Sequence, residues 1–217
     1  MKGALPSILF LFLSIANAYT LRAQSDRGDV AAWLLPGVSW QPSSKFRLLG
    51  QPGYNSYYRA GLGYIQGFIT IHKNIVLNPG YMYYIRKTDK GAHQHSHFLM
   101  NAVTPQIQFG SFLLDNRNML WIRTGTDIEP LYYYRNRFRL VKSFHLADRE
   151  AKLYGYNEAF RLLNNGTWTR NRFAAGTSYD ILPHANVDVT YIRQWDRTGG
   201  WLHLFFIMAT WRLPSGK

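Results

Sequence analysis

The chain has 217 residues, no cysteine and a formal net charge of +13 at pH 7. The lack of cysteine excludes a disulfide framework, a thiolate metal site and a thiol nucleophile. A basic excess is often a sign of nucleic-acid binding, but the arginines here are spread singly through strand-like segments and do not form a run. We therefore expect no nucleic-acid partner.

The N-terminus has the layout of a secretory signal. Lys2 is followed by the apolar run 8–15 and by Ala16-Asn17-Ala18, a small-x-small pattern that precedes a cleavage site. The run is too short to span a membrane as a helix. We predict a cleaved signal over residues 1–18, with an alternative cut as late as residue 24, and a single mature domain over 19–217. A retained N-terminal anchor is the alternative.

Composition favours a membrane barrel for the mature chain. Aromatic residues make up 16% of the sequence, although its mean hydropathy is slightly negative at −0.25. Tyr and Trp collect at both membrane interfaces of an outer-membrane barrel, and the interior of such a barrel is polar. A chain that is polar on average and rich in aromatic residues fits that description.

Turn signals divide the mature sequence into ten or eleven strand-like segments. In chain order the signals lie at 41–44, 51–53, 72–74, 88–91, 109–111, 125–127, 147–148, 164–166, 182–184 and 196–200. Tight reversals at 72–74, 110, 147–148 and 183–184 alternate with longer connections at 88–94, 125–131, 163–167 and 195–200, as in outer-membrane barrels. We predict an all-β fold, a closed antiparallel transmembrane β-barrel of 10–12 strands. Twelve is the preferred count, because bacterial barrels favour even numbers, and the last strand is expected over 200–213.

Charged and apolar side chains alternate along the segments. Arg135, Arg137 and Arg139 share one face of a strand, because strand side chains have a period of two, and Phe138 and Leu140 lie on the other face. Asn136 is an exception on the apolar face. A face this polar cannot pack into the dry core of a sandwich. It predicts an enclosed wet interior, with a soluble sheet facing water as the alternative.

The most coherent candidate site is a polar network inside this barrel. It consists of one carboxylate and six arginines, namely Glu158, Arg117, Arg135, Arg137, Arg139, Arg170 and Arg172. Such a network either forms a salt-bridge ladder that fills a narrow barrel or gives a basic pore that favours anions. The structural role is preferred.

Two weaker candidates concern metal binding and catalysis. His93, His95 and His97 share a strand face, but no obvious carboxylate ligand is nearby and the stretch borders a loop. We expect solvated histidines, no metal and no cofactor. Ser143 and His145, with Asp148 nearby, allow a lipid hydrolase or deacylase, but no nucleophile elbow accompanies them. Whether the protein is an enzyme is left open, with a non-enzymatic role preferred.

Three short motifs occur in order in the C-terminal half. They are Arg-x-Arg-x-Arg at 135–139, Tyr-Asn-Glu at 156–158 and Asn-Arg-x-x-x-Gly at 171–176. Together they resemble a family of uncharacterised bacterial outer-membrane β-barrels, a domain of unknown function. The resemblance covers 132–195 well and the N-terminal half only in general layout. It implies a barrel in the outer membrane of a Gram-negative bacterium, surrounded by outer-membrane lipids, and it assigns no activity.

These observations leave three hypotheses. The preferred one is a non-enzymatic outer-membrane barrel that acts as a narrow, anion-favouring pore or as a structural wall protein. The second is an outer-membrane lipid hydrolase or deacylase, and the third is a soluble secreted β-sheet binding protein.

Overall fold

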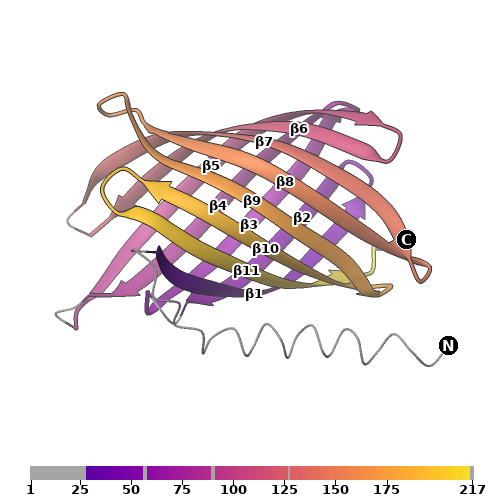
Figure 1. Ribbon diagram of the computed structural model, residues 1–217, viewed down its shortest axis with the longest axis horizontal. Coiled ribbons are helices and arrows are strands. Elements are labelled where there is room, and N and C mark those ends of the chain that lie inside the picture. The colour runs from indigo at the N-terminus through magenta and orange to yellow at the C-terminus, as the bar shows by residue number, and fades with distance from the viewer. Residues whose placement is uncertain (1–27, 56–57, 89–90, 127, 216–217) are drawn as a thin grey trace.

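The computed structural model describes residues 28–55, 58–88, 91–126 and 128–215, which form one closed β-barrel (Figure 1). The predicted signal peptide, residues 1–18, lies outside this part of the chain. The strands are β1 (Gly28–Ser43), β2 (Phe46–Asn55), β3 (Ala60–His72), β4 (Ile75–Lys87), β5 (His93–Phe109), β6 (Phe112–Gly125), β7 (Ile128–Leu146), β8 (Arg149–Leu162), β9 (Thr167–Leu182), β10 (Ala185–Asp196) and β11 (Gly200–Leu213). No helix within the described residues has the length and apolarity to cross a membrane.

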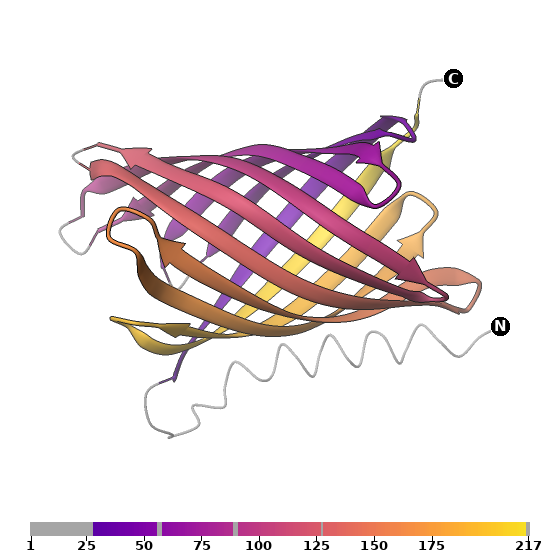
Figure 2. The same ribbon diagram turned by 90° about the horizontal axis from the view of Figure 1, so that it is seen from above.

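Each strand pairs with the next one in sequence, and β11 returns to β1 to close the barrel (Figures 1 and 2). The predicted closed barrel is confirmed, and eleven strands fall within the predicted range of ten to twelve, but the preferred count of twelve is wrong. The odd number also changes the closing pair. Because every turn reverses the chain, the first and eleventh strands run in the same direction, and β1 pairs with β11 in parallel from Gly28↔Trp201 to Trp40↔Leu213. The other neighbouring pairs are antiparallel.

Most predicted turns lie where the turn chemistry placed them. Ala147 and Asp148 have φ of 50° and 61°, so both residues are left-handed, as in the tight hairpin turn that matches strand twist. The predicted last strand is confirmed by β11, Gly200–Leu213. The longer connection predicted over 125–131 is wrong, because β6 ends at Gly125 and β7 begins at Ile128.

The turn predicted at 51–53 is also wrong. Pro52 lies inside β2 and remains in register with Gly63 of β3. On its other side, the pairing of β2 with β1 is interrupted between Gly50 and Tyr54. A proline has no backbone N–H to donate to a neighbouring strand. A strand therefore tolerates a proline where its pairing with that neighbour is interrupted.

Burial alternates along the strands as a closed wall requires. In β5, Ser96, Phe98, Met100, Ala102 and Thr104 are buried, and the residues between them are exposed. The same alternation places the arginine-bearing faces of β6, β7 and β9 in the interior. The outward positions carry large exposed apolar side chains, such as Leu34 on β1, Leu99 on β5 and Phe173 on β9.

One side of the interior is apolar, which the arginine pattern did not predict. Trp33, Leu35 and Ala60 form a buried cluster, and Trp33 stacks on Phe206 with ring centroids 6.4 Å apart. A second cluster contains Met100, Ala102 and Met119, with Trp121 packed against it. Trp33 and Trp121 therefore belong to the interior and not to the outer wall. The inward positions Ala31 to Leu35 of β1 carry no charge, so packed apolar side chains fill this side of the interior.

Candidate functional site: the interior arginine–carboxylate network

Glu158 on β8 is the centre of the interior network. It is 2% exposed. Its Oε1 accepts hydrogen bonds from Nη2 of Arg117 at 2.7 Å and from Nη2 of Arg135 at 2.9 Å, and its Oε2 accepts from Nη1 of Arg172 at 3.4 Å. These arginines come from β6, β7 and β9, so one carboxylate links four strands. The strand register produces this arrangement, because Glu158 is paired with Arg137 on one side and with Arg172 on the other.

Asp115 on β6 is a second centre and was missing from the predicted network. It is 1% exposed. Its Oδ2 accepts a hydrogen bond from Nε of Arg139 at 2.7 Å, and its Oδ1 accepts one from Nη2 of Arg137 at 3.4 Å. The sequence does indicate this position, because Asp115 lies two residues before Arg117 and so shares its strand face.

Aromatic rings hold the guanidinium groups on the side of the network nearest Phe160. Phe160 is 1% exposed, and the Cζ atoms of Arg135, Arg172 and Arg170 lie 4.5, 4.9 and 5.3 Å from its ring centroid. Arg135 also lies 4.5 Å from the ring of Trp121. A guanidinium over an aromatic face gains cation–π attraction, and this gain increases when the pair is shielded from water. The charges are therefore stacked as well as paired.

The network continues toward the longer-loop end of the barrel. Nε of Arg170 donates to Oδ1 of Asp196 at 2.5 Å, and Nε of Arg172 donates to Oε1 of Gln194 at 2.6 Å. Gln194 in turn donates to Oδ2 of Asp196 at 2.5 Å. This extension joins β9 to β10 through charged and amide side chains.

A further polar group lies closer to the short-turn end. The hydroxyl of Tyr154 donates to Oδ1 of Asp188 at 2.5 Å and is 2.6 Å from Oγ1 of Thr190. Gly176 makes room for this ring, because a Cβ at that position would lie 2.4 Å from the Tyr154 side chain. Larger side chains are therefore excluded at the last residue of the Asn-Arg-x-x-x-Gly motif.

The structure places all seven predicted network residues in the barrel interior, but around three carboxylates and not one. Glu158 binds three of the arginines, Asp115 binds two and Asp196 binds one. Five guanidinium groups thus share the two most buried carboxylates, which leaves this region with net positive charge. The Nε atoms of Arg117, Arg135 and Arg137 are buried without a hydrogen-bond partner. The arrangement ties strands β6–β10 together and makes the interior electrostatically unfavourable for cations.

The candidate histidines lie on the outer face of β5, at the end of the strand that borders the loop between β4 and β5. The Nδ1 atoms of His95 and His97 are 2.5 and 2.7 Å from the hydroxyls of Tyr83 and Tyr81, and each pair of rings is stacked. His93 is exposed at the start of β5. Among the described residues, no three His, Asp or Glu side chains lie close enough together to hold a metal ion.

Ser143, His145 and Asp148 do not form a hydrogen-bonded group. Ser143 and His145 lie near the end of β7, where they pair in register with Lys152 and Glu150 of β8. Asp148 belongs to the tight turn that follows. No hydrogen bond in the described part of the chain links the three side chains.

Comparison with known proteins identifies a family. A family model matches residues 13–202, and the family is described as a protein of unknown function (DUF2490). No curated protein matches the chain. The family match covers most of the sequence, including the three motifs that carried the predicted resemblance and the whole interior network. The chain therefore belongs to this family of unknown function, and its described fold is a closed eleven-stranded β-barrel.

Proposed function

We propose that this protein is an outer-membrane β-barrel that acts as a closed wall protein, with its interior filled at mid-height. The observation that carries the proposal is the opposite character of the two faces of the same strands. Arginines paired with carboxylates point inward, and large aliphatic and aromatic side chains point outward. This is the reverse of a soluble domain, in which charges face the solvent and apolar side chains form the core.

The outer wall supports a membrane location. Leu34, Ile65 and Phe173 lie near the middle of their strands and are 53%, 45% and 58% exposed. Exposed tryptophans lie toward both ends, with Trp168, Trp195 and Trp201 near the longer loops and Trp40 and Trp211 near the short turns. An apolar band between two aromatic girdles is the surface of an outer-membrane barrel.

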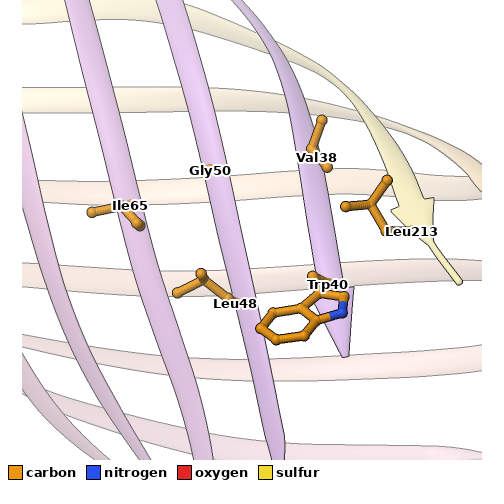
Figure 3. A pocket seen from close by; sticks show the side chains of 6 residues that line it. All are labelled: Val38, Trp40, Leu48, Gly50, Ile65 and Leu213. Atoms are coloured by element: carbon orange, nitrogen blue, oxygen red, sulfur yellow. The ribbon is translucent and has the colours of Figure 1, made fainter. Parts of the chain in front are cut away.

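A shallow apolar pocket on this wall fits the same location. It spans β1, β2, β3 and the end of β11, next to the closing pair of strands (Figure 3). Its lining is nonpolar throughout and consists of Val38, Trp40, Leu48, Gly50, Ile65 and Leu213. Facing outward from a barrel wall, such a surface is suited to lipid acyl chains.

The filled interior supports a wall protein and not an open pore. Phe160, Met119 and Ile192 are among the largest fully buried side chains, and they extend from different strands into the interior. The arginines around Glu158 occupy the polar side of the same region, with side-chain exposures of 12–16%. A barrel of this size is small enough for its interior to be filled by side chains.

Bilayer recording tests the closed interior. We expect the purified wild-type protein to insert into planar lipid bilayers without steady conductance, because the Phe160–Arg135 stack blocks the interior. The double variant Phe160→Ala/Arg135→Ala is expected to conduct, with a preference for anions that comes from the remaining arginines. Lys152→Ala, a partly exposed residue near a turn, is the control and should stay closed. Steady wild-type conductance would contradict the closed state, and a mature protein that remains soluble without detergent would contradict the membrane location.

A further inference from the structure

One sector of the outer wall is polar at the height where the rest is apolar. Five outward-facing asparagines on β5–β8, here called the asparagine belt, are Asn101, Asn116, Asn118, Asn136 and Asn157. Asn101 is the middle residue of the 17-residue strand β5. Asn118 and Asn136 are also near the middle of their strands and are directly paired in register. The belt therefore crosses the wall midway between its two ends.

Three members of the belt form a hydrogen-bonded group with Tyr134. Nδ2 of Asn118 donates to Oδ1 of Asn116 at 2.6 Å, and Nδ2 of Asn136 lies 3.0 Å from Oδ1 of both Asn116 and Asn118. The Tyr134 hydroxyl donates to Oδ1 of Asn118 at 2.6 Å. Within the described chain, neither Nδ2 of Asn116 nor Oδ1 of Asn136 forms a hydrogen bond. The group thus presents an open donor and an open acceptor side by side.

The opposite sector shows that the belt is not a general property of the wall. In the order of strands around the barrel, β1 is as far from β6 and β7 as any strand. Its outward positions include Leu34 and Val38, and Leu34 is paired in register with Ile207 of β11. An amide whose hydrogen-bonding groups are unsatisfied costs free energy when it faces lipid acyl chains, whereas an aliphatic side chain there does not. If the barrel lies in a membrane, as proposed above, another polar surface must cover the belt.

We propose that the asparagine belt is the contact surface between two copies of this chain in the membrane. In a two-fold symmetric pair, each surface meets itself, so the surface must be complementary to itself. Primary amides meet this condition because each carries both a donor and an acceptor. Rotation by a two-fold axis brings the open donor of Asn116 in one copy opposite the open acceptor of Asn136 in the other. Hydrogen bonds between polar side chains and close packing are what hold membrane-embedded segments together, because lipid competes with apolar contacts.

The surroundings of the belt provide the packing. A shallow groove beside it is lined by apolar side chains together with Asn101, Asn118 and Tyr134. Phe138 projects from the adjacent strand β7 and is 51% exposed. The groove and Phe138 lie on the same sector, so two-fold pairing allows the Phe138 of each copy to approach the groove of the other. Phe138 in the groove and amides at the centre make one continuous contact surface.

The absence of cysteine makes this contact directly testable. We propose to introduce a single thiol by Asn136→Cys in the full-length protein and to oxidise outer-membrane preparations with copper phenanthroline. A covalent dimer is expected. The matched control is Leu34→Cys, at an outward mid-strand position on the opposite sector, which is expected to cross-link at least ten-fold less. Equal cross-linking of the two variants would reflect random collision and would overturn the proposal.

A second measurement detects the dimer without a disulfide, in case the two introduced thiols are close but poorly oriented for oxidation. The mass of the wild-type protein in lipid nanodiscs is expected to be that of a dimer, and Asn116→Leu/Asn118→Leu/Asn136→Leu is expected to shift it to that of a monomer. A monomeric wild type, or a complex formed only with a different protein or with lipopolysaccharide, would overturn the proposal. A wild type that is monomeric but requires detergent leaves the membrane barrel intact and refutes only the dimer. A freely soluble wild type refutes both.

Discussion

Glu158→Gln is expected to lower the free energy of unfolding in detergent by about 3–5 kcal/mol, the range for removing one partner from a buried ion pair. The carboxylate is the shared acceptor for Arg117, Arg135 and Arg172, and it is 2% exposed. Glutamine keeps the size of the side chain but removes the negative charge, which leaves three buried guanidinium groups without their counter-ion. Denaturant titration followed by tryptophan fluorescence, with heat-modifiable gel migration as a second probe, measures the loss.

The matched control for this variant is Glu150→Gln on the same strand. Glu150 pairs with Lys152 at 3.2 Å, and the two side chains are 44% and 40% exposed. An exposed pair of this kind contributes about 0–1 kcal/mol. If both variants lose the same stability, the interior carboxylate has no special role in holding strands β6–β9 together.

Leu34→Arg is expected to destabilise the folded protein in a lipid bilayer by about 2–4 kcal/mol, the range for arginine on the lipid face of a membrane barrel near the midplane. Leu34 lies near the middle of β1 and is 53% exposed. On a soluble protein, an exposed leucine replaced by arginine changes stability by about 0.5 kcal/mol or less. The size of the effect therefore separates a lipid-facing wall from a water-facing one.

Leu163→Arg provides the comparison at the end of the barrel. Leu163 is similarly exposed, at 45%, but it follows β8 in the turn that leads to β9. Near or beyond the interface the cost of arginine falls to about 0–1 kcal/mol. Refolding into vesicles, with the folded fraction measured over a denaturant series, gives both values. Two small and equal effects would favour the soluble alternative over a membrane barrel.

The sequence by itself determined the strand faces and most of the turns. The spacing of Arg135, Arg137 and Arg139 placed them on one side of a strand, because strand side chains alternate whatever the tertiary structure is. Gly200 and Leu213 were predicted as the bounds of the last strand for a similar local reason, since a glycine-bearing turn precedes an apolar segment of spanning length. Asn136 already broke the apolar face in the sequence, but the register of β6 and β7 is what places Asn116 and Asn118 beside it.

The tertiary structure alone decided which residues meet. Arg117 and Glu158 are 41 residues apart, and they bind each other only because the registers of β6–β7 and β7–β8 bring them side by side. The strand count likewise decided that β1 and β11 close the barrel in parallel. Closure of β1 onto β11 also decided that the inward-facing Trp33 stacks on Phe206. Local alternation fixes the face on which a side chain lies, but the neighbours across that face depend on the shear and closure of the whole sheet.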